Sequence, residues 1–371
     1  MASPEVGLLD QVATTLWAES RAHDRADADL TAMLAPLTKS GLFKAVLPPP
    51  FGIGLATNPD QIPALIRVLR LIGGANLSVG RLFEGHVNAA KLVFAFGGSA
   101  QREAFADAVT RGAVSGVWNA ESPPVLELGS EFDRNVLRGR KIYCSGAGFL
   151  SLPLVTARIA TGETVMIVSP SIATAATYDL SGWRMRGMRA TATGTVDFTG
   201  IAVTQTEIIG RPGDFYRHPG FRGGAWRFCA VQTGAIERIA YQMRQSLRER
   251  GRQADPHQRA RTTAAAVAAE TARLWVSAAA RCVESEGIDV WEAVSFAGMA
   301  RIAVEQSAVS VIQLAEKSLG LAAFAEAEPI ERVVRDLSTY LRQPFPDAAA
   351  DDVAKRYLDA DPGVHPGLEA G

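Results

Sequence analysis

Apolar residues recur with two different periods along the chain, and the change of period divides it into three parts. Up to about residue 112 they recur every three or four positions, as in "DQIPALIRVLRLI" (60–72) and "VNAAKLVFAFGG" (87–98). This spacing predicts amphipathic helices, and Gly97 marks the end of the second one. The run "PPPFGIG" (48–54), which precedes both segments, can form only a loop between helices, because proline breaks helices and strands.

From residue 113 to 215 the apolar runs are short, rich in β-branched residues and separated by glycines, as in "LVTARIATGETVMIVSP" (154–170). The "ATGET" segment between two apolar runs predicts a β-hairpin. From residue 216 onward helical spacing returns. We expect one helix to begin at Asp255-Pro256, a second to end at Gly320, and a third to begin near Pro329 and stop before Pro344. The pattern predicts a helical domain (1–112), a central antiparallel β domain (113–215) and a C-terminal helical bundle (216–371), an α+β fold.

The composition limits the class of protein but does not indicate which reaction it catalyses. The 371 residues carry a formal net charge of −1, which does not favour nucleic-acid binding. Three scattered cysteines fit a reducing compartment, and the acidic start of the chain does not resemble a secretory signal. No apolar run approaches the roughly 20 residues needed to span a bilayer. We therefore expect a cytoplasmic protein.

Familiar catalytic patterns such as GxSxG, HExxH and the P-loop are missing, and the five histidines do not occur at metal-ligand spacing. We therefore expect no metal. Two segments of the β domain stand out, "WNAES" (118–122) and "KIYCSG" (141–146). If they pair, they bring an aromatic ring, hydroxyls and backbone amides together, as a planar ligand such as a flavin requires. The alternative is that Trp118 and Tyr143 are ordinary sheet aromatics.

Five segments, in order, resemble motifs of the acyl-CoA dehydrogenase superfamily. They are "SGLFKAVLPPPFGIG" (40–54), the helices leading to "WNAES" (75–122), "NVLRGRKIYCSGAG" (135–148), "GWRMRGMRATATGTVDFTGIAV" (182–203) and "EKSLGLAAFAEAEPIERVVRDL" (316–337). The resemblance implies that family's fold: an N-terminal helical domain, a β-barrel-like domain and a C-terminal four-helix bundle. It also implies a homodimer or homotetramer with non-covalent FAD between the β domain and the bundle.

The resemblance also assigns residues to the cofactor. Trp118, Asn119 and Ala120 fall on the family's first flavin-facing strand, where Ala120 replaces the usual threonine. Tyr143 falls on the flavin-stacking aromatic and Ser145 on the flavin-bonding hydroxyl. A second set matches residues that reach the FAD of a neighbouring subunit: Arg250 or Arg252, Gln258 and Gly320, with Leu321 in place of a second glycine.

The family's catalytic base is missing at its usual position. A dehydrogenase of this family oxidises an acyl-CoA by removing an α-proton with a glutamate, and electron-transfer flavoprotein or oxygen accepts the electrons. That glutamate position falls on Pro344, and the family's alternative position, around residues 222–230, contains no acidic residue. Asp347 is the remaining candidate base, and its alternative role is to cap a helix.

Two other functions therefore stay open. "KIYCSGAG" resembles more closely the form found in the superfamily's flavin-dependent monooxygenases, which require no such glutamate. In that branch a serine and a histidine assist the flavin. Here these would be Ser145 and His86, or His86 is structural. The other possibility is a non-catalytic FAD-binding protein. The resemblance favours an acyl-CoA-dehydrogenase-like oxidoreductase first, with the monooxygenase as the alternative.

Overall fold

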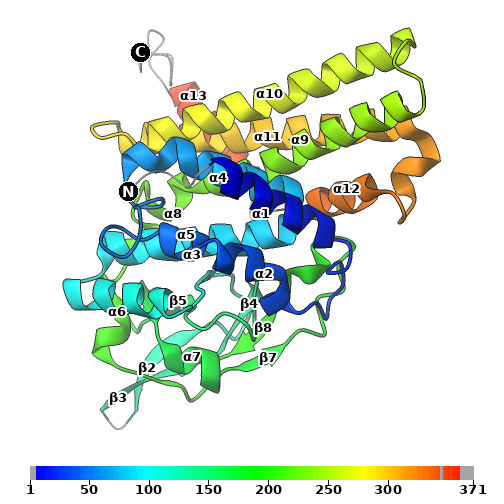
Figure 1. The fold of residues 1–371 in the computed structure, drawn as a ribbon. Helices are drawn as coiled ribbons and strands as arrows, with labels where there is room; N and C mark the ends of the chain where they lie inside the picture. Colours follow the sequence, from blue (N-terminus) through cyan, green and yellow to red (C-terminus); the bar gives the residue numbers. More distant parts are fainter. Residues whose placement is uncertain (1–5, 132, 343–345, 360–371) are drawn as a thin grey trace.

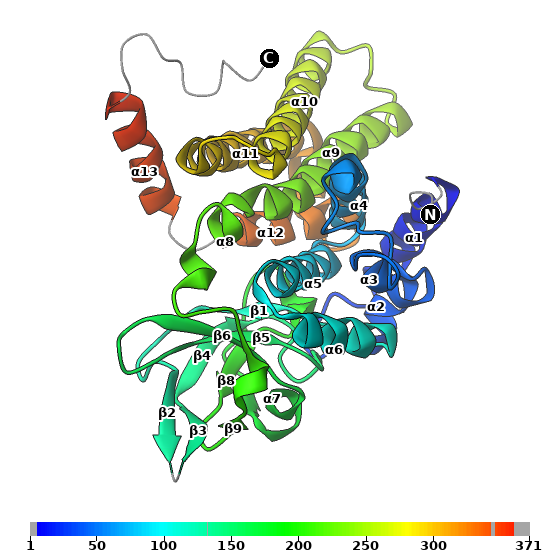
Figure 2. The ribbon, with the colours of Figure 1, turned by 90° about the vertical axis from the view of Figure 1, so that its left-hand side faces the viewer.

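The computed structural model describes residues 6–131, 133–342 and 346–359. Two helical layers and a β region lie on top of one another (Figure 1). The long C-terminal helices form the top layer, the strands lie at the bottom, and helix α5 (Leu77–Phe96) runs between them (Figures 1 and 2). This central position explains why α5 is buried on nearly every side from Leu77 to Val93.

The N-terminal helices form as the spacing of apolar residues predicts. Helix α5 stops at Gly97, and residues 48–54 form a loop. The other N-terminal helices are α1 (Val6–Glu19), α2 (Leu30–Lys39), α3 (Leu42–Ala45), α4 (Ile62–Ala75) and α6 (Ser99–Thr110).

The β region contains two sheets. The larger has the order β10-β6-β5-β2-β3-β9, with β1 added beside β5, and the smaller has the order β4-β8-β7. The hairpin predicted at "ATGET" is present, because β5 and β6 pair antiparallel with Leu154 opposite Val168. The sheet is not wholly antiparallel as predicted, since β1 and β2 both run parallel to β5. The strands and the short helix α7 have these bounds: β1 Val117–Trp118, β2 Glu127–Glu131, β3 Arg134–Arg138, β4 Arg140–Cys144, β5 Leu154–Arg158, β6 Thr164–Val168, α7 Pro170–Ala175, β7 Thr177–Asp179, β8 Gly194–Asp197, β9 Ala202–Val203 and β10 Ile208–Ile209.

The C-terminal helices begin and end close to their predicted positions. Asp255 caps α10 by accepting from two backbone N–H groups, and Gly320, with φ of 63°, ends α11. Helix α13 was not predicted; it begins at Pro346, where proline suits a first helical position. The bounds are α8 Gly220–Gly223, α9 Ala225–Glu249, α10 Pro256–Glu284, α11 Val290–Leu319, α12 Pro329–Tyr340 and α13 Pro346–Asp359.

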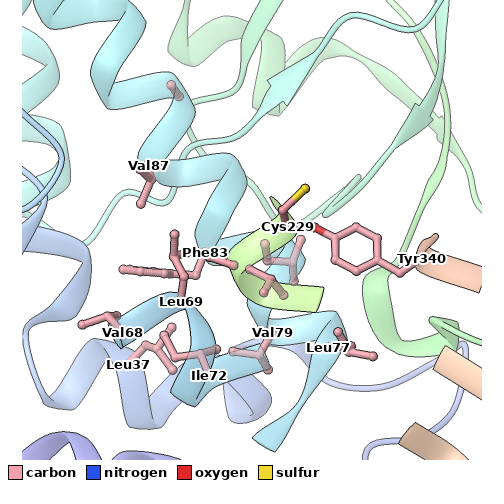
Figure 3. Close-up of a cluster of buried hydrophobic side chains, with 14 of the residues drawn as sticks. Leu37, Val68, Leu69, Ile72, Leu77, Val79, Phe83, Val87, Cys229 and Tyr340 are labelled. Atoms are coloured by element: carbon pink, nitrogen blue, oxygen red, sulfur yellow. The ribbon is translucent and has the colours of Figure 1, made fainter. Parts of the chain in front are cut away.

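Helices α4 and α9 cross with almost no side chain between them. A Cβ placed on Gly234 would lie 1.9 Å from the Arg70 carbonyl oxygen, and one on Gly73 would lie 2.1 Å from the Val231 oxygen. Glycine is therefore required at both positions. Around this crossing lies a buried apolar cluster that includes Leu69 and Phe83 (Figure 3).

Helix α12 fastens the β region to the bundle. The backbone N–H of Met188 donates to Asp336 at 2.7 Å, and Arg335 donates to the Arg186 carbonyl at 2.9 Å. A Cβ on Gly187 would lie 2.2 Å from the Arg335 carbonyl oxygen, so the loop before β8 touches the helix backbone.

In the described part of the chain, no single helix is both long and apolar enough to cross a membrane. One bent pair, Val290–Phe324 with Pro329–Tyr340 at 118°, meets that test together, by length and composition only.

Candidate functional site

The two segments singled out in the β domain lie side by side. The backbone N–H of Ile142 in β4 donates to the Ala120 carbonyl at 3.1 Å. Glu121 forms an isolated antiparallel bridge with Lys141. The Trp118 indole N–H donates to the Ser145 carbonyl at 2.9 Å. The pairing on which the flavin prediction depended is therefore present.

Tyr143 and Ser145 present polar and aromatic groups on this surface. Tyr143 is 57% exposed and has φ of 53°, at an irregularity of the β4–β8 ladder between Lys141 and Cys144. The hydroxyl oxygen of Ser145 accepts from Thr193 at 3.2 Å. Since that bond uses a lone pair, the Ser145 hydrogen is left to donate elsewhere. An exposed ring and a free hydroxyl donor fit the edge of a flavin, which carries acceptor atoms.

Three further residues were assigned to the first flavin-facing strand: Trp118, Asn119 and Ala120. They differ in the groups that they present to a ligand. The Trp118 ring is only 2% exposed and packs edge-on against Tyr178 and Phe198. The Trp118 ring thus supports the Ser145 backbone, and a contact between Trp118 and a flavin stays a prediction. The Ala120 carbonyl accepts a hydrogen bond within the sheet. The methyl side chain of Ala120 offers no polar group. Asn119 accepts from Thr156 at 2.7 Å through its side-chain oxygen, which leaves its amide N–H groups as donors.

A buried ion pair fixes this strand pair. The Lys141 side chain is fully buried and its ammonium group lies 2.9 Å from Glu121, which also pairs with Arg158 at 2.7 Å. Burial lowers the pKa of Lys141, and Glu121 opposes that shift. Burial raises the pKa of Glu121, but its bonds to Lys141 and Arg158 outweigh this and lower it. Glu121 is therefore a paired anion.

His86 lies where a catalytic role is hard to fulfil. Its ring is fully buried; Nε2 lies 3.0 Å from the Phe43 carbonyl, and Nδ1 accepts from the Ser115 backbone N–H at 3.0 Å. Burial lowers its pKa to about 4. A neutral ring with both nitrogens bonded to backbone atoms joins α5 to α3 and to the segment before β1, which is a structural position.

The second predicted set lies apart from β4, at the far end of the bundle (Figures 1 and 2). Arg250 pairs with Glu328 at 3.5 Å and Arg252 with Asp255 at 3.9 Å. Gln258 is buried beside Ser318, which lies two residues before Gly320. When the Gln258 amide takes its flipped orientation, the side-chain oxygen accepts from Arg252 at 3.1 Å. One protomer therefore brings these residues together with each other but not with Ser145.

The side chain of the candidate base, Asp347, has no partner among the described residues. It is exposed in the first turn of α13 and forms no hydrogen bond or ion pair with another described side chain. Helix α13 is fastened elsewhere, through Arg222 and Asp352 at 3.4 Å and through Arg356 over the Trp291 ring. Pro344 lies outside the described residues.

A small cleft beside Ser145 involves residues that the sequence analysis missed. It is lined by Arg81, Leu82, Gly85, Gly116, Val117, Ser145 and Leu150. Arg81 donates to the buried carboxylate of Glu84 at 2.7 Å. Nothing in the sequence distinguished Arg81, because one arginine on an apolar helix resembles an ordinary surface position. Within the described ranges, no group of three or more His, Cys, Asp or Glu side chains is placed to hold a metal ion.

Comparisons with known proteins find similar sequences among monooxygenases and similar folds among solved structures. No protein-family model matches the chain. Dibenzothiophene monooxygenases of Rhodococcus erythropolis and Rhodococcus qingshengii are 30% identical over 207 residues, which is 52% of this chain and 48% of theirs. The match thus spans about half the length of these curated relatives.

Solved structures match over nearly the whole chain. FMN-bound TdsC from Paenibacillus sp. A11-2 superposes with a TM-score of 0.85 at 19% identity, covering 95% of this chain and 96% of TdsC. Butyryl-CoA dehydrogenase from Megasphaera elsdenii gives 0.82 at 17% identity, with 95% and 96% covered. The chain therefore has the acyl-CoA dehydrogenase fold, as the sequence resemblance predicted.

Proposed function

We propose that this protein is a flavin-dependent monooxygenase that binds a reduced flavin against β4 and residues 118–122. The observation that carries the proposal is the face formed by Tyr143 and Ser145, which offers a ring and a hydroxyl donor, while the two described carboxylates beside it, Glu121 and Glu84, are both paired. Glu121 is paired with Lys141 and Arg158, and Glu84 with Arg81. Proton abstraction needs a free base, and oxygenation does not. The 30% identity to dibenzothiophene monooxygenases supports the same choice.

In this proposal the chain's own residues bind and orient. A bound reduced flavin supplies two electrons to molecular oxygen, one atom of which enters the substrate while the other leaves as water. Ser145 donates to an acceptor on the flavin edge, and Thr193 holds the Ser145 hydroxyl in that direction. Tyr143 covers the ring, and Asn119 provides further donors. Trp118 fixes the Ser145 backbone from below.

The test begins with flavin binding, measured by fluorescence titration of the purified chain with FMN and with FAD. Ser145→Ala should weaken binding about three- to tenfold, the usual effect of one lost hydrogen bond. Ser130→Ala, which alters an exposed serine in β2, is the matched control. Reduced flavin with oxygen-18 gas and indole or dibenzothiophene should then give a product carrying one labelled atom. TdsC, which has been crystallised with indole, motivates this choice of probe.

The second candidate is the acyl-CoA dehydrogenase that the resemblance favoured first; the fold and the likeness to butyryl-CoA dehydrogenase support it. Anaerobic bleaching of the bound flavin by butyryl-CoA, with no labelled product from oxygen, would replace the monooxygenase proposal with this one. A chain that binds neither FMN nor FAD would exclude both.

We also propose a homo-oligomer formed through α10. One face of this helix packs into the bundle through alanines, whereas Val267 and Leu274, two turns apart, are 59% and 55% exposed. The helix lies at the outer edge of the bundle (Figure 2). Large aliphatic side chains repeated every seven residues on an exposed helix are typical of a helix–helix interface.

A further inference from the structure

Hydrogen bonds connect Ser145 to helix α12 through the loop before β8. The single hydroxyl hydrogen of Thr193 is shared between the Ser145 and Thr191 hydroxyl oxygens, with oxygen–oxygen distances of 3.2 and 2.7 Å. Thr191 gives its own hydrogen to the Met188 carbonyl at 2.9 Å. The backbone N–H of Met188 then donates to the carboxylate of Asp336 in α12 at 2.7 Å. The connection therefore leads from the candidate flavin face to a charged group of the bundle.

The Ser145 end of this connection is the end that a ligand can reach. Thr191, Thr193 and Asp336 are buried, whereas Ser145 is half-buried. Water cannot readily replace a lost partner at the buried positions, so each hydroxyl depends on its neighbour for its direction. A change at Thr191 or Asp336 should therefore alter the direction of the Ser145 hydroxyl.

The loop before β8 has a backbone that its surroundings must hold. Met188 has φ of 57° and Ala192 has φ of 42°, in the left-handed region that residues other than glycine rarely adopt. Such residues persist only where neighbouring contacts fix them. Here the Met188 carbonyl also accepts from the Trp183 indole at 2.9 Å, and the Ala192 carbonyl accepts from the Ala147 backbone N–H at 3.0 Å. The loop is thus fastened to the chain just after β4.

Charged groups hold Asp336 in place at the other end of the connection. Arg332 and Arg335, on the same helix, each lie 3.6 Å from one of its carboxylate oxygens. Arg335 also pairs with Asp24, which approaches from the segment between α1 and α2. The Asp336 carboxylate is therefore a fixed acceptor for the Met188 N–H.

We infer that Asp336 and Thr191 are positioning residues for the Ser145 hydroxyl, so that helix α12 influences how tightly the face beside β4 binds a flavin. Both side chains are buried, and each acts through the hydrogen bonds that lead to Thr193. A hydroxyl donor contributes fully to binding only when its direction is held. The inference rests on the proposed function, which places a flavin against Ser145, and it adds two residues that the proposed function does not use.

The test is a double-mutant cycle on the purified full chain, with the dissociation constant for FMN measured by fluorescence titration. In Thr191→Val a methyl group replaces the hydroxyl beside Thr193. A methyl group cannot approach an oxygen to 2.7 Å, so Thr193 must turn from its present direction. We expect FMN to bind about threefold more weakly, the effect of one weakened hydrogen bond. In the Ser145→Ala background the same substitution should change nothing further.

Conservative and control variants separate positioning from stability. Thr191→Ser keeps the hydroxyl and should bind FMN as the parent does. Thr233→Val, which alters a buried threonine of α9 bonded to its own helix, is the matched control and should also keep the parent affinity.

The α12 end is tested in the same way. Asp336→Ala removes the acceptor of the Met188 N–H, so it should weaken FMN binding about threefold in the parent but not in Ser145→Ala. Asp336→Asn keeps an acceptor oxygen and should retain the parent affinity. Ser338→Ala, on the same helix, is the control. The Thr191 cycle decides the inference even where Asp336→Ala does not fold.

Parent-like or tighter FMN binding in Thr191→Val would overturn the inference. So would an equal loss in the parent and in Ser145→Ala, since the effect would then be general destabilisation. If Ser145→Ala weakens FMN binding and Thr191→Val does not, the inference fails while the proposed function stands. A chain that binds neither FMN nor FAD would reject the proposed function itself, and the inference with it.

Discussion

At the scale of single residues, the candidate site contains side chains that can reach a ligand and side chains that hold them in place. Tyr143 and Ser145 belong to the first group. Trp118 and His86 belong to the second, because both rings are buried and bonded to backbone atoms. The support matters because a hydroxyl donor is useful only when its direction is held by neighbouring bonds.

His86 should make stability depend on pH in a defined window. Burial lowers its folded-state pKa to about 4 from 6.5. Below about pH 6.5 the unfolded chain takes up a proton that the folded chain refuses, so the unfolding free energy falls as the pH drops toward 4, by up to about 3 kcal/mol. His86→Gln should be less stable than the parent at pH 7, and urea unfolding should show this gap narrowing as the pH falls.

The matched control for that experiment is His257→Gln, which alters an exposed histidine at the start of α10. It should follow the parent curve throughout. A gap between His86→Gln and the parent that stays constant from pH 7 to 4 would contradict the buried, neutral state of His86.

Sequence patterns located the pairing segments but not the roles of their residues. Trp118 was assigned to the cofactor because the resemblance places it on the flavin-facing strand, and the sequence did not show that its indole is buried and bonded to the Ser145 carbonyl. Arg81 was missed because α5 is covered by the sheet and by the bundle at once. Local periodicity cannot show that an arginine lines a cleft formed by a strand far along the chain.

At the scale of elements, helix ends were the most predictable feature and helix crossings the least. Asp255 and Gly320 marked the ends of α10 and α11 because capping is local chemistry. The approach of α4 to α9 depends on glycines 161 positions apart, Gly73 and Gly234, so only the folded chain reveals it. Helix α13 was missed because Pro344 and Pro346 indicated an end, whereas Pro346 begins a new helix.

The α4–α9 crossing should tolerate no added carbon. In Gly234→Ala the new methyl group would lie 1.9 Å from the Arg70 carbonyl oxygen, which only backbone movement can relieve. We expect the unfolding free energy to fall by about 3 kcal/mol or more, measured by urea denaturation. Gly7→Ala, in α1 with nothing within 4 Å of the added atom, is the control and should raise stability by about 0.5 kcal/mol. Equal stability of both variants would contradict the close crossing.

At the scale of the whole molecule, α10 is an outer helix with apolar side chains on both faces. Its buried face is explained by the bundle, and its exposed Val267 and Leu274 are the motive for the proposed assembly. The resemblance to the acyl-CoA dehydrogenase superfamily already implied a homodimer or homotetramer. Which of its faces would remain uncovered became clear only from the packing of α9 and α11 against it.

Charges placed on that face should separate the protomers. The double variant Val267→Glu with Leu274→Glu should be monomeric by size-exclusion chromatography with light scattering, because two carboxylates would have to be buried in the interface. Leu358→Glu, on an 80% exposed side chain of α13, is the control and should keep the parent mass. A monomeric parent, or an unchanged mass in the double variant, would reject α10 as the interface.

The separation of the two predicted cofactor sets has a consequence for how cofactor choice could change. The ring-facing residues around Ser145 belong to one protomer and need no second chain. The residues around Arg250 and Gln258 lie at the other end of the bundle (Figures 1 and 2), and in the proposed assembly they would act from a neighbouring protomer. In the proposed assembly, affinity for a mononucleotide would be encoded within a chain, and any extra affinity for a dinucleotide would be encoded in the quaternary contacts. Mutations could alter one without disturbing the other, which would let related proteins exchange FMN for FAD while keeping the same catalytic face.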